Sequence, residues 1–460
     1  MKKLIILSTL LIATLTAFSN NQSITFKVDM RKAKKQANSI VALRGNVSPL
    51  SWKENIVLTD ADNDGFFTAT VNFDKNTKLA YKYVCDEKWE NGDNRSLDLT
   101  SENTTNDIWN VEKPSSTPPF VFEKEGKTQN FAERMASEQI VHGVSQIILH
   151  NDKIDTVLTW GFRDVDAKLP VDANTLFHIG GMGQSLTAFA MLRAAETKRI
   201  DLDQPVNKYL KTIQLEGNFT VRDLMLGKIK MSGEKKPFGY VKGDKIPNLE
   251  EIFAGKKTNT PKFSQGNGEN KDPIFNIFAP LTAQMVLENV YQKSFSDIVE
   301  MEILKPLDMK NTVVTAELNE KQSENASVGY DKKGNEVEGK RMIFPELGFG
   351  GVWTTPTDYA KFVSHLIKAS RGENNTLLSQ NLAKSALEGQ NQYRSLVFPN
   401  GDDGGNYLGG ASTGFRTQVG FNAADNTIIV SFINSYENWR VMLDLEKQGK
   451  RFLNSKNHKQ

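Results

Sequence analysis

The chain has 460 residues, of which 38% are hydrophobic and 24% charged, a composition typical of globular proteins and not of disordered or fibrous ones. At roughly 100 to 200 residues per domain, this length predicts two or three domains. Lys and Arg number 57 against 55 Asp and Glu, so the formal net charge is only +2 and no overall field attracts nucleic acid or an acidic membrane surface.

The N-terminus has the pattern of a bacterial export signal. Two lysines precede the apolar run 4–17, and the small residues Ala17 and Ser19 stand at the positions that a signal peptidase inspects. The run is too short to span a bilayer, and no other stretch approaches the roughly 18 uninterrupted apolar residues of a membrane helix. We predict a signal peptide at 1–19, export to the periplasm or the medium, and no membrane span.

Residues 20–112 contain short segments that alternate as half-buried β-strands do. In the segment 66–73 one face carries only apolar side chains, those of Phe67, Ala69, Val71 and Phe73. Residues 23–29 and 79–84 follow the same pattern. Several such strands separated by turns predict a small Ig-like β-sandwich.

A proline-rich stretch separates this domain from the rest of the chain. Lys113-Pro114-Ser115-Ser116-Thr117-Pro118-Pro119 resists both helix and central strand, so we predict a linker at 113–126. The remaining residues, 127–460, have hairpins at both ends and helices between them, which predicts one α+β domain. The expected strands are 146–149, 156–160, 416–421 and 427–432, and the expected helices are 186–196, 282–290, 358–367 and 439–452.

A colinear series of segments in this larger domain resembles the serine β-lactamase and penicillin-binding-protein superfamily, most of all its class C β-lactamase and esterase branch. The segments are Gly161-Phe162-Arg163-Asp164-Val165, Thr175-Leu176-Phe177-His178-Ile179-Gly180, Leu304-Lys305-Pro306-Leu307-Asp308-Met309-Lys310-Asn311-Thr312, Gly350-Gly351-Val352-Trp353-Thr354-Thr355-Pro356-Thr357-Asp358 and Gly414-Phe415. The resemblance implies the fold, whereas activity has to be argued from the site.

The residues that the family uses for acyl transfer are absent at the matching positions. The Ser-x-x-Lys motif aligns with Gly181-Met182-Gly183-Gln184, and glycine has no side chain to be acylated, while a glutamine amide does not titrate near neutral pH. The Tyr-x-Asn motif aligns with Ile277-Phe278-Ala279, and the basic-x-Gly motif with Leu408-Gly409-Gly410. We therefore predict no catalytic residues at the degenerate positions Gly181, Gln184, Ile277, Ala279 and Leu408.

Other candidate chemistry is weaker. Ser185 lies one turn beyond Gly181 but has no lysine three residues later, so we interpret it as a structural helix serine in preference to a relocated nucleophile. The five histidines show no paired metal spacing, so a metal site has no support. We interpret His178 as a residue of a buried or edge strand. Asp60-Ala61-Asp62-Asn63-Asp64-Gly65 imitates half a calcium loop, but Val71 at the twelfth position favours a polar turn. We predict no metal and no cofactor.

The smaller domain resembles the starch-binding carbohydrate modules found at the ends of glucoamylases. The resemblance rests on Gly45-Asn46-Val47-Ser48-Pro49-Leu50-Ser51-Trp52, Tyr81-Lys82-Tyr83 and Trp89-Glu90-Asn91-Gly92-Asp93-Asn94-Arg95. It implies a sugar site formed by Trp52, Trp89, Lys82 and Asn94, because an indole stacks on the apolar face of a sugar while Lys and Asn bind its hydroxyls. A core role for both tryptophans is the alternative.

Three functions remain open at this point. The first is an exported glycan-binding pseudoenzyme that holds a polysaccharide of the α-glucan kind. The second is a divergent serine hydrolase, an esterase or peptidase. The third is an inert scaffold that binds another protein. The oligomeric state cannot be predicted from these patterns.

Overall fold

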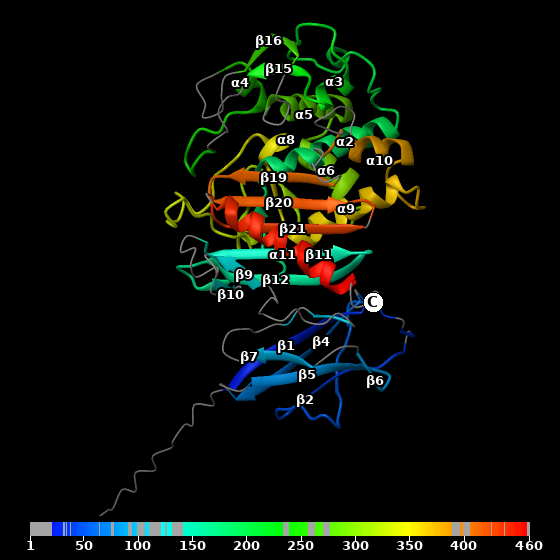
Figure 1. Ribbon diagram of the computed structural model, residues 1–460, viewed down its shortest axis with the longest axis vertical. Coiled ribbons are helices and arrows are strands. Elements are labelled where there is room, and N and C mark those ends of the chain that lie inside the picture. Colours follow the sequence, from blue (N-terminus) through cyan, green and yellow to red (C-terminus); the bar gives the residue numbers. More distant parts are fainter. Residues whose placement is uncertain are drawn as a thin grey trace, which may run out of the picture. The chain divides into compact units, whose positions relative to one another are not determined.

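The computed structural model describes two compact units, Met1–Lys113 and Pro114–Gln460 (Figure 1). The described residues are 21–30, 33, 35–36, 38–63, 65–74, 78–90, 94–98, 105, 107–109, 121–124, 127–130, 141–232, 239–255, 263–269, 277–388, 396–398, 405–424, 426–436 and 438–457. The predicted signal peptide and the proline-rich stretch lie outside them. No helix within these ranges is long and apolar enough to cross a membrane.

The smaller unit is a sandwich of two sheets. One has the order β4-β1-β8 and the other the order β3-β2-β5-β6, with β7 also paired to β5. The strands are β1 (Asn21–Asp29), β2 (Val41–Gly45), β3 (Ile56–Val57), β4 (Phe66–Asp74), β5 (Lys78–Cys85), β6 (Lys88–Trp89), β7 (Arg95–Asp98) and β8 (Asp107–Ile108). The alternation predicted for the expected strands is confirmed, since Phe67, Ala69, Val71 and Phe73 of β4 all contact one core.

The larger unit is built on a six-stranded antiparallel sheet of order β13-β12-β11-β21-β20-β19. Its strands are β11 (Gly143–His150), β12 (Lys153–Asp164), β13 (Leu169–Pro170), β19 (Asn406–Ser412), β20 (Phe415–Asn422) and β21 (Thr427–Ile433). Both predicted hairpins are present. The first turns tightly because Asn151 and Asp152 adopt positive φ angles of 50° and 62°, which match the twist of the strands that they join.

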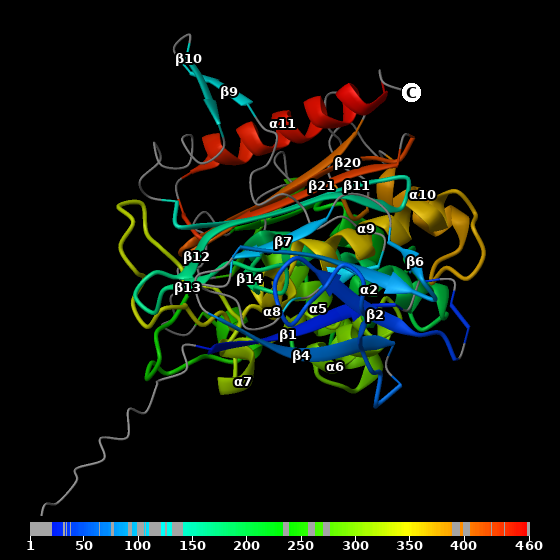
Figure 2. The same cartoon turned by 90° about the horizontal axis from the view of Figure 1, so that it is seen from below.

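Helices cover both faces of this sheet (Figure 2), so the side chains of its central strands are buried on both sides. Ile429 and Ile433 of β21 pack with the C-terminal helix α11 (Trp439–Asn457), whereas Ile428, Val430 and Phe432 join the main core on the other face. Helix α9 (Pro356–Ser370) packs against β11 and β21 on that second face. The run 428–433, which is apolar except for Ser431, therefore belongs to a strand that is buried on both sides.

The rest of the larger unit is mainly helical. The predicted helices 186–196, 282–290, 358–367 and 439–452 correspond to α2 (Gln184–Glu196), α5 (Phe278–Tyr291), α9 and α11. Shorter helices are α3 (Val221–Met225), α4 (Leu249–Phe253), α6 (Phe295–Val299), α7 (Glu320–Ser323), α8 (Leu347–Gly350) and α10 (Gln380–Leu387), with η1 (Gly180–Gly183), η2 (Val206–Lys208) and a π-helical turn η4 (Glu300–Leu304). The larger unit also contains small sheets. One is formed by β14 (Phe177–His178), β18 (Val352–Thr354) and β17 (Val313–Val314), and another by β15 (Ile229–Ser232) and β16 (Ser264–Glu269).

The last part of the segment 113–126, which we predict as a linker, contains a strand. Strand β9 (Val121–Lys124) pairs with β10 (Lys127–Asn130) as a short hairpin. The prolines end at Pro119, and Val121-Phe122 are residues that favour strands.

Candidate functional site

The position expected for a nucleophile lies in η1, directly before α2. The backbone of Gly181 is helical, but a Cβ built on it would lie 3.1 Å from Cζ and 3.4 Å from Cε2 of Phe349. The preceding Gly180 has a φ of +52°, and a Cβ there would overlap the backbone of Ala411 in β19. The phenyl ring of Phe349 thus stands where a side chain at Gly181 would project.

Helix α8 holds this ring in place. The backbone N–H of Gly348 donates to Oε1 of Gln284 at 2.8 Å, and Oγ1 of Thr187 donates to the carbonyl of Gly348 at 2.6 Å. These two bonds join α8 to α5 and to α2. Sequence reasoning missed Phe349 because its contact with Gly181 is purely tertiary, although the glycine-rich string Leu347-Gly348-Phe349-Gly350-Gly351 indicates a close approach of backbones.

The positions that align with the other two family motifs carry buried apolar side chains. Ile277 and Ala279, at the start of α5, are 2% and 8% exposed, and Leu408 on the edge strand β19 is 4% exposed. All three belong to the main core. A Cβ on Gly410 would overlap the carbonyl of Ile179, so β19 lies against η1. These positions can pack the fold, but they offer no proton acceptor and no charge.

Ser185 is fully buried in the first turn of α2. Its Oγ donates to the carbonyl of Met182 at 2.8 Å and lies 2.8 Å from the hydroxyl of Tyr359. Burial raises the pKa of Tyr359 well above its usual range, so this phenol stays protonated and cannot serve as a base at neutral pH. The contacts are those of the structural serine that we interpreted from the sequence.

A second serine forms the contact most similar to a nucleophile and base pair. Oγ of Ser412 lies 2.7 Å from Nδ1 of His178, and both residues are buried, with the imidazole stacked on Phe344 at 4.7 Å. Burial lowers the pKa of His178 to about 4, so the ring is neutral at pH 7. His178 lies on β14, an edge strand, as predicted. The cavity beside the pair, lined also by Glu346 and Phe349, has room for about one water molecule.

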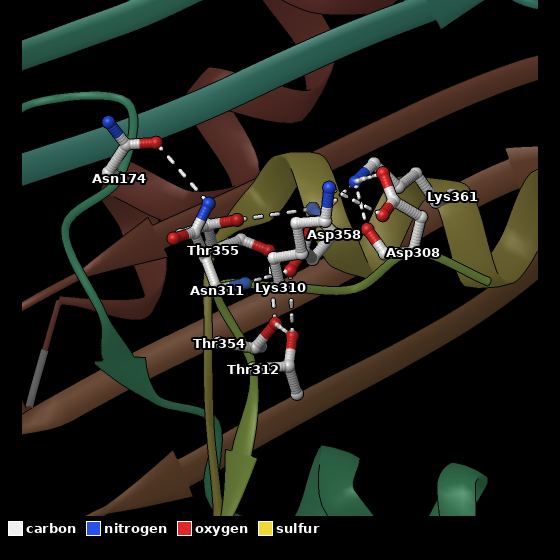
Figure 3. Close-up of polar contacts among 9 residues, drawn as sticks. All are labelled: Asn174, Asp308, Lys310, Asn311, Thr312, Thr354, Thr355, Asp358 and Lys361. Carbon is white, nitrogen blue, oxygen red and sulfur yellow. Dashed lines mark hydrogen bonds and ion pairs between the residues drawn. The ribbon is translucent and has the colours of Figure 1, made fainter. Parts of the chain in front are cut away.

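Two of the segments that carried the β-lactamase resemblance, 304–312 and 350–358, meet at Asp358, which is 1% exposed (Figure 3). Its carboxylate accepts from the backbone N–H of Asn311 at 2.7 Å, from Oγ1 of Thr312 at 3.2 Å and from Nζ of Lys361 at 2.9 Å. Its own N–H donates to Oγ1 of Thr355 and caps α9. Asp358 therefore fastens the loop before β17 to the start of α9, a structural role.

In the smaller unit the two tryptophans of the predicted sugar site lie together on the surface. Their ring centroids are 6.1 Å apart with an interplanar angle of 54°, and Trp89 is 42% exposed while Trp52 is half-buried. Neither belongs to the core of the unit. Lys82 is half-buried on β5, and Asn94 is exposed just before β7. Sequence reasoning missed Arg44, whose guanidinium lies over the Trp89 ring, 5.2 Å from the centroid.

A buried ion cluster supports this surface from the inside. Arg95 donates to Glu90 from Nε at 2.9 Å and from Nη2 at 2.6 Å, and from Nη1 to Asp107 at 3.1 Å. The hydroxyls of Tyr81 and Tyr83 donate to the other oxygen of Asp107 at 2.9 and 2.8 Å. Bonds to both carboxylates raise the pKa of Arg95 despite its burial. Since Glu90 directly follows Trp89, the cluster fixes the backbone at β6.

Family models match both units. A model described as Beta-lactamase matches residues 128–448, and one described as Starch binding domain matches residues 21–109. Both resemblances predicted from the sequence are confirmed, and so is the fold class of each unit. The boundaries 20–112 and 127–460 stay predictions.

Among similar proteins, Protein flp of Staphylococcus aureus (strain MW2) is 23% identical over 310 residues, or 64% of this chain and 60% of that protein. Teichoic acid D-alanine hydrolase of Staphylococcus aureus is 25% identical over 224 residues, 48% of this chain and 53% of that protein. The chain thus spans only part of the length of these curated relatives.

Solved structures share the fold of the larger unit. FmtA from Staphylococcus aureus is 21% identical with a TM-score of 0.55, covering 69% of this chain and 86% of that one. A class C β-lactamase from Rhodobacter sphaeroides is 15% identical with a TM-score of 0.56, covering 70% of this chain and 97% of that one.

Proposed function

The chain belongs to the β-lactamase family, and from that premise we propose that it is an exported glycan-binding protein whose larger unit performs no acyl transfer. The observation that carries the proposal is the pair of surface indoles, Trp52 and Trp89, in a unit matched by a starch-binding model. The ligand is a polysaccharide of the α-glucan kind, and the predicted signal at 1–19 directs the protein out of the cytoplasm.

The geometry of the indoles fits such a ligand. Two rings inclined at 54° present neighbouring apolar faces at different angles, so they suit a chain that bends between successive sugars. Lys82 and Asn94 supply donors for hydroxyl groups near the stacked rings. Both roles are supported by the starch-binding match and by the accessibility of these side chains, since Lys82 is half-buried and Asn94 is exposed.

In the larger unit, Gly181 and its neighbours lack the groups that acyl transfer needs. A serine at this position would meet the ring of Phe349, and Gln184 offers no proton acceptor one turn later. Where nucleophile and base are both removed from a serine hydrolase, turnover falls on the order of a millionfold. The larger unit then serves as a scaffold or as a second binding surface.

Affinity electrophoresis of the full chain in soluble starch tests glycan binding. We expect the wild type to be retarded and the double variant Trp52→Ala/Trp89→Ala to migrate freely. The matched control is Trp439→Ala, which removes a tryptophan that is 51% exposed in the larger unit and should leave retardation unchanged. Equal migration of the wild type with and without starch would sink the proposal.

A serine hydrolase is the second candidate, favoured by the 2.7 Å contact between Ser412 and His178 and by the teichoic acid D-alanine hydrolase among the similar proteins. The one-water cavity beside this pair argues against it. A fluorophosphonate probe separates the candidates. We expect no covalent label on the wild type, whereas a label that disappears in Ser412→Ala or in Ser185→Ala would establish a relocated nucleophile.

A further inference from the structure

We propose that Arg44 is a positioning residue of the glycan site, which sets the angle between Trp52 and Trp89 through a closed triangle of hydrogen bonds with Asn55 and Glu87. The inference rests on the proposed glycan binding and adds residues that the starch-binding resemblance did not supply.

The triangle is closed by three short contacts. Nε of Arg44 donates to Oδ1 of Asn55 at 2.7 Å, and Nη2 of Arg44 donates to Oε2 of Glu87 at 2.6 Å. Nδ2 of Asn55 donates to Oε1 of Glu87 at 3.0 Å. The hydrogen bond from Arg44 lowers the pKa of Glu87, so this carboxylate is ionised at neutral pH. Each of the three side chains is therefore hydrogen-bonded to the other two.

The corners lie on the segments that carry the indoles. Asn55 is three residues after Trp52 in the loop before β3, and Glu87 is two residues before Trp89 in the turn between β5 and β6. Glu87 itself has a φ of 61°, a backbone conformation that fixes the direction of this turn. The triangle therefore ties one tryptophan-bearing segment to the other, although they are far apart in the sequence.

Arg44 also contacts the ring of Trp89 directly. It lies on β2 opposite Lys82 of β5, while Trp89 of β6 lies opposite Val84, so the three side chains share one face of the sheet. The guanidinium carbon lies 5.2 Å from the centroid of Trp89, within the range of a cation–π contact. Its side chain is 12% exposed and so is largely held by these neighbours.

An ordered indole pair lowers the entropic cost of binding a ligand of fixed curvature. Immobilising one side chain on binding costs an amount equivalent to about a three- to tenfold loss of affinity. β-Cyclodextrin, a closed ring of glucose units, cannot adapt to a changed indole angle, whereas linear maltoheptaose can. Loss of Arg44 should therefore weaken cyclodextrin binding about three- to tenfold and maltoheptaose binding less.

The test is calorimetric titration of the full chain with both ligands. Arg44→Ala and Glu87→Gln should weaken cyclodextrin binding, and Arg44→Lys should restore little, because an ammonium group cannot form the planar contacts of a guanidinium. Arg440→Ala is the matched control, since Arg440 lies over Trp439, 5.6 Å from its centroid, in the larger unit. In a Trp89→Ala background, Arg44→Ala should have no further effect on affinity.

A measurement without ligand separates positioning from a general loss of fold. Two indoles at 6.1 Å produce an exciton couplet in the far-ultraviolet circular dichroism spectrum, whose size depends on their mutual angle. We define the couplet as the difference between the spectra of a protein with Trp52 and of the same protein carrying Trp52→Ala. We expect this difference to change when Arg44→Ala is present and to stay the same when Arg440→Ala is present.

The outcomes are distinct. If neither ligand binds the wild type, the proposed function fails. If Trp89→Ala weakens binding but Arg44→Ala changes neither the affinity ratio of the two ligands nor the couplet, the proposed function stands and the role of Arg44 is refuted.

Discussion

The contact between Gly181 and Phe349 allows a quantitative test of how firmly the expected nucleophile position is filled. The variants are Gly181→Ala, Phe349→Ala and their combination. Because the backbone of Gly181 is helical, alanine fits it without strain and reduces the conformational entropy of the unfolded chain. Without any contact to Phe349, Gly181→Ala should therefore raise the free energy of unfolding by about 0.4 to 1 kcal/mol. The new Cβ, however, lies 3.1 Å from the ring, and overpacking of this kind costs about 1 to 3 kcal/mol.

The two effects give a coupled prediction. With the ring present we expect Gly181→Ala to lower the free energy of unfolding by about 1 kcal/mol, because the half-buried ring can yield in part. With the ring removed, the same substitution should raise it by about 0.5 kcal/mol. The difference, about 1.5 kcal/mol, is the interaction energy of a double-mutant cycle.

Scanning calorimetry of the full chain measures the cycle as shifts in Tm. For a unit of this size, 1 kcal/mol corresponds to a shift of about 1.5 °C. The transition of the smaller unit serves as an internal reference that should not move. Gly180→Ala is the control, since its left-handed φ of +52° and its overlap with Ala411 should cost several kcal/mol, about 3 or more, in either background. Equal shifts for Gly181→Ala in both backgrounds would refute the claim that the ring excludes a side chain.

Further predictions concern the buried polar groups. Ser185→Ala should cost about 1 to 2 kcal/mol, because the hydroxyl of Tyr359 loses its partner, and should leave reactivity toward a fluorophosphonate unchanged; urea unfolding and gel labelling check the two parts. Arg95→Ala should lower the stability of the smaller unit by about 3 to 5 kcal/mol, since it leaves Glu90 and Asp107 buried without their cation; a smaller loss, seen in its thermal transition, would mean that water compensates. Asp358→Ala should cost about 2 to 4 kcal/mol through the lost bonds to Asn311, Thr312 and Lys361, with Asp358→Asn intermediate. The lowered pKa of His178 makes folding weaker in acid: the unfolded imidazole takes up a proton near pH 6.5 but the folded one only near pH 4, so stability is full above pH 6.5 and falls by about 3 kcal/mol down to pH 4. In His178→Asn this slope should be shallower, and an unchanged slope would assign it to other groups such as His365, whose pKa is also lowered to about 4.

Local patterns were sufficient for most elements of the fold. The alternation in β4, the helical spacing in α2 and α9 and the two hairpins were predictable because each depends on residues close together in the sequence. The hairpin β9–β10 was not predicted, because the prolines before it dominated the composition of the segment. The pairing of β11 with β21 could not be predicted from periodicity, since it joins opposite ends of the larger unit.

Some residues of the candidate sites could likewise be predicted from the sequence, whereas others are brought together only by the fold. Trp52 and Trp89 could be named from the sequence because a family resemblance supplied them, and the structure places their rings together. Arg44, Asn55 and Glu87 come from three separate segments, none with a motif of its own, so the triangle exists only in the folded chain. Ser412 and His178 are likewise joined only by the close approach of β14 and β19.

The central position of β21 has a consequence for synthesis of the protein. Residues of β21 bond to β11 on one side and to β20 on the other, so the middle of the sheet is missing until Ile433 has emerged from the ribosome. The smaller unit, in contrast, finds all its strand partners between Asn21 and Ile108. A nascent chain can therefore complete the starch-binding unit while the β-lactamase-like unit is still without its core strand. During that interval β11 lacks the strand that pairs with it in the folded protein.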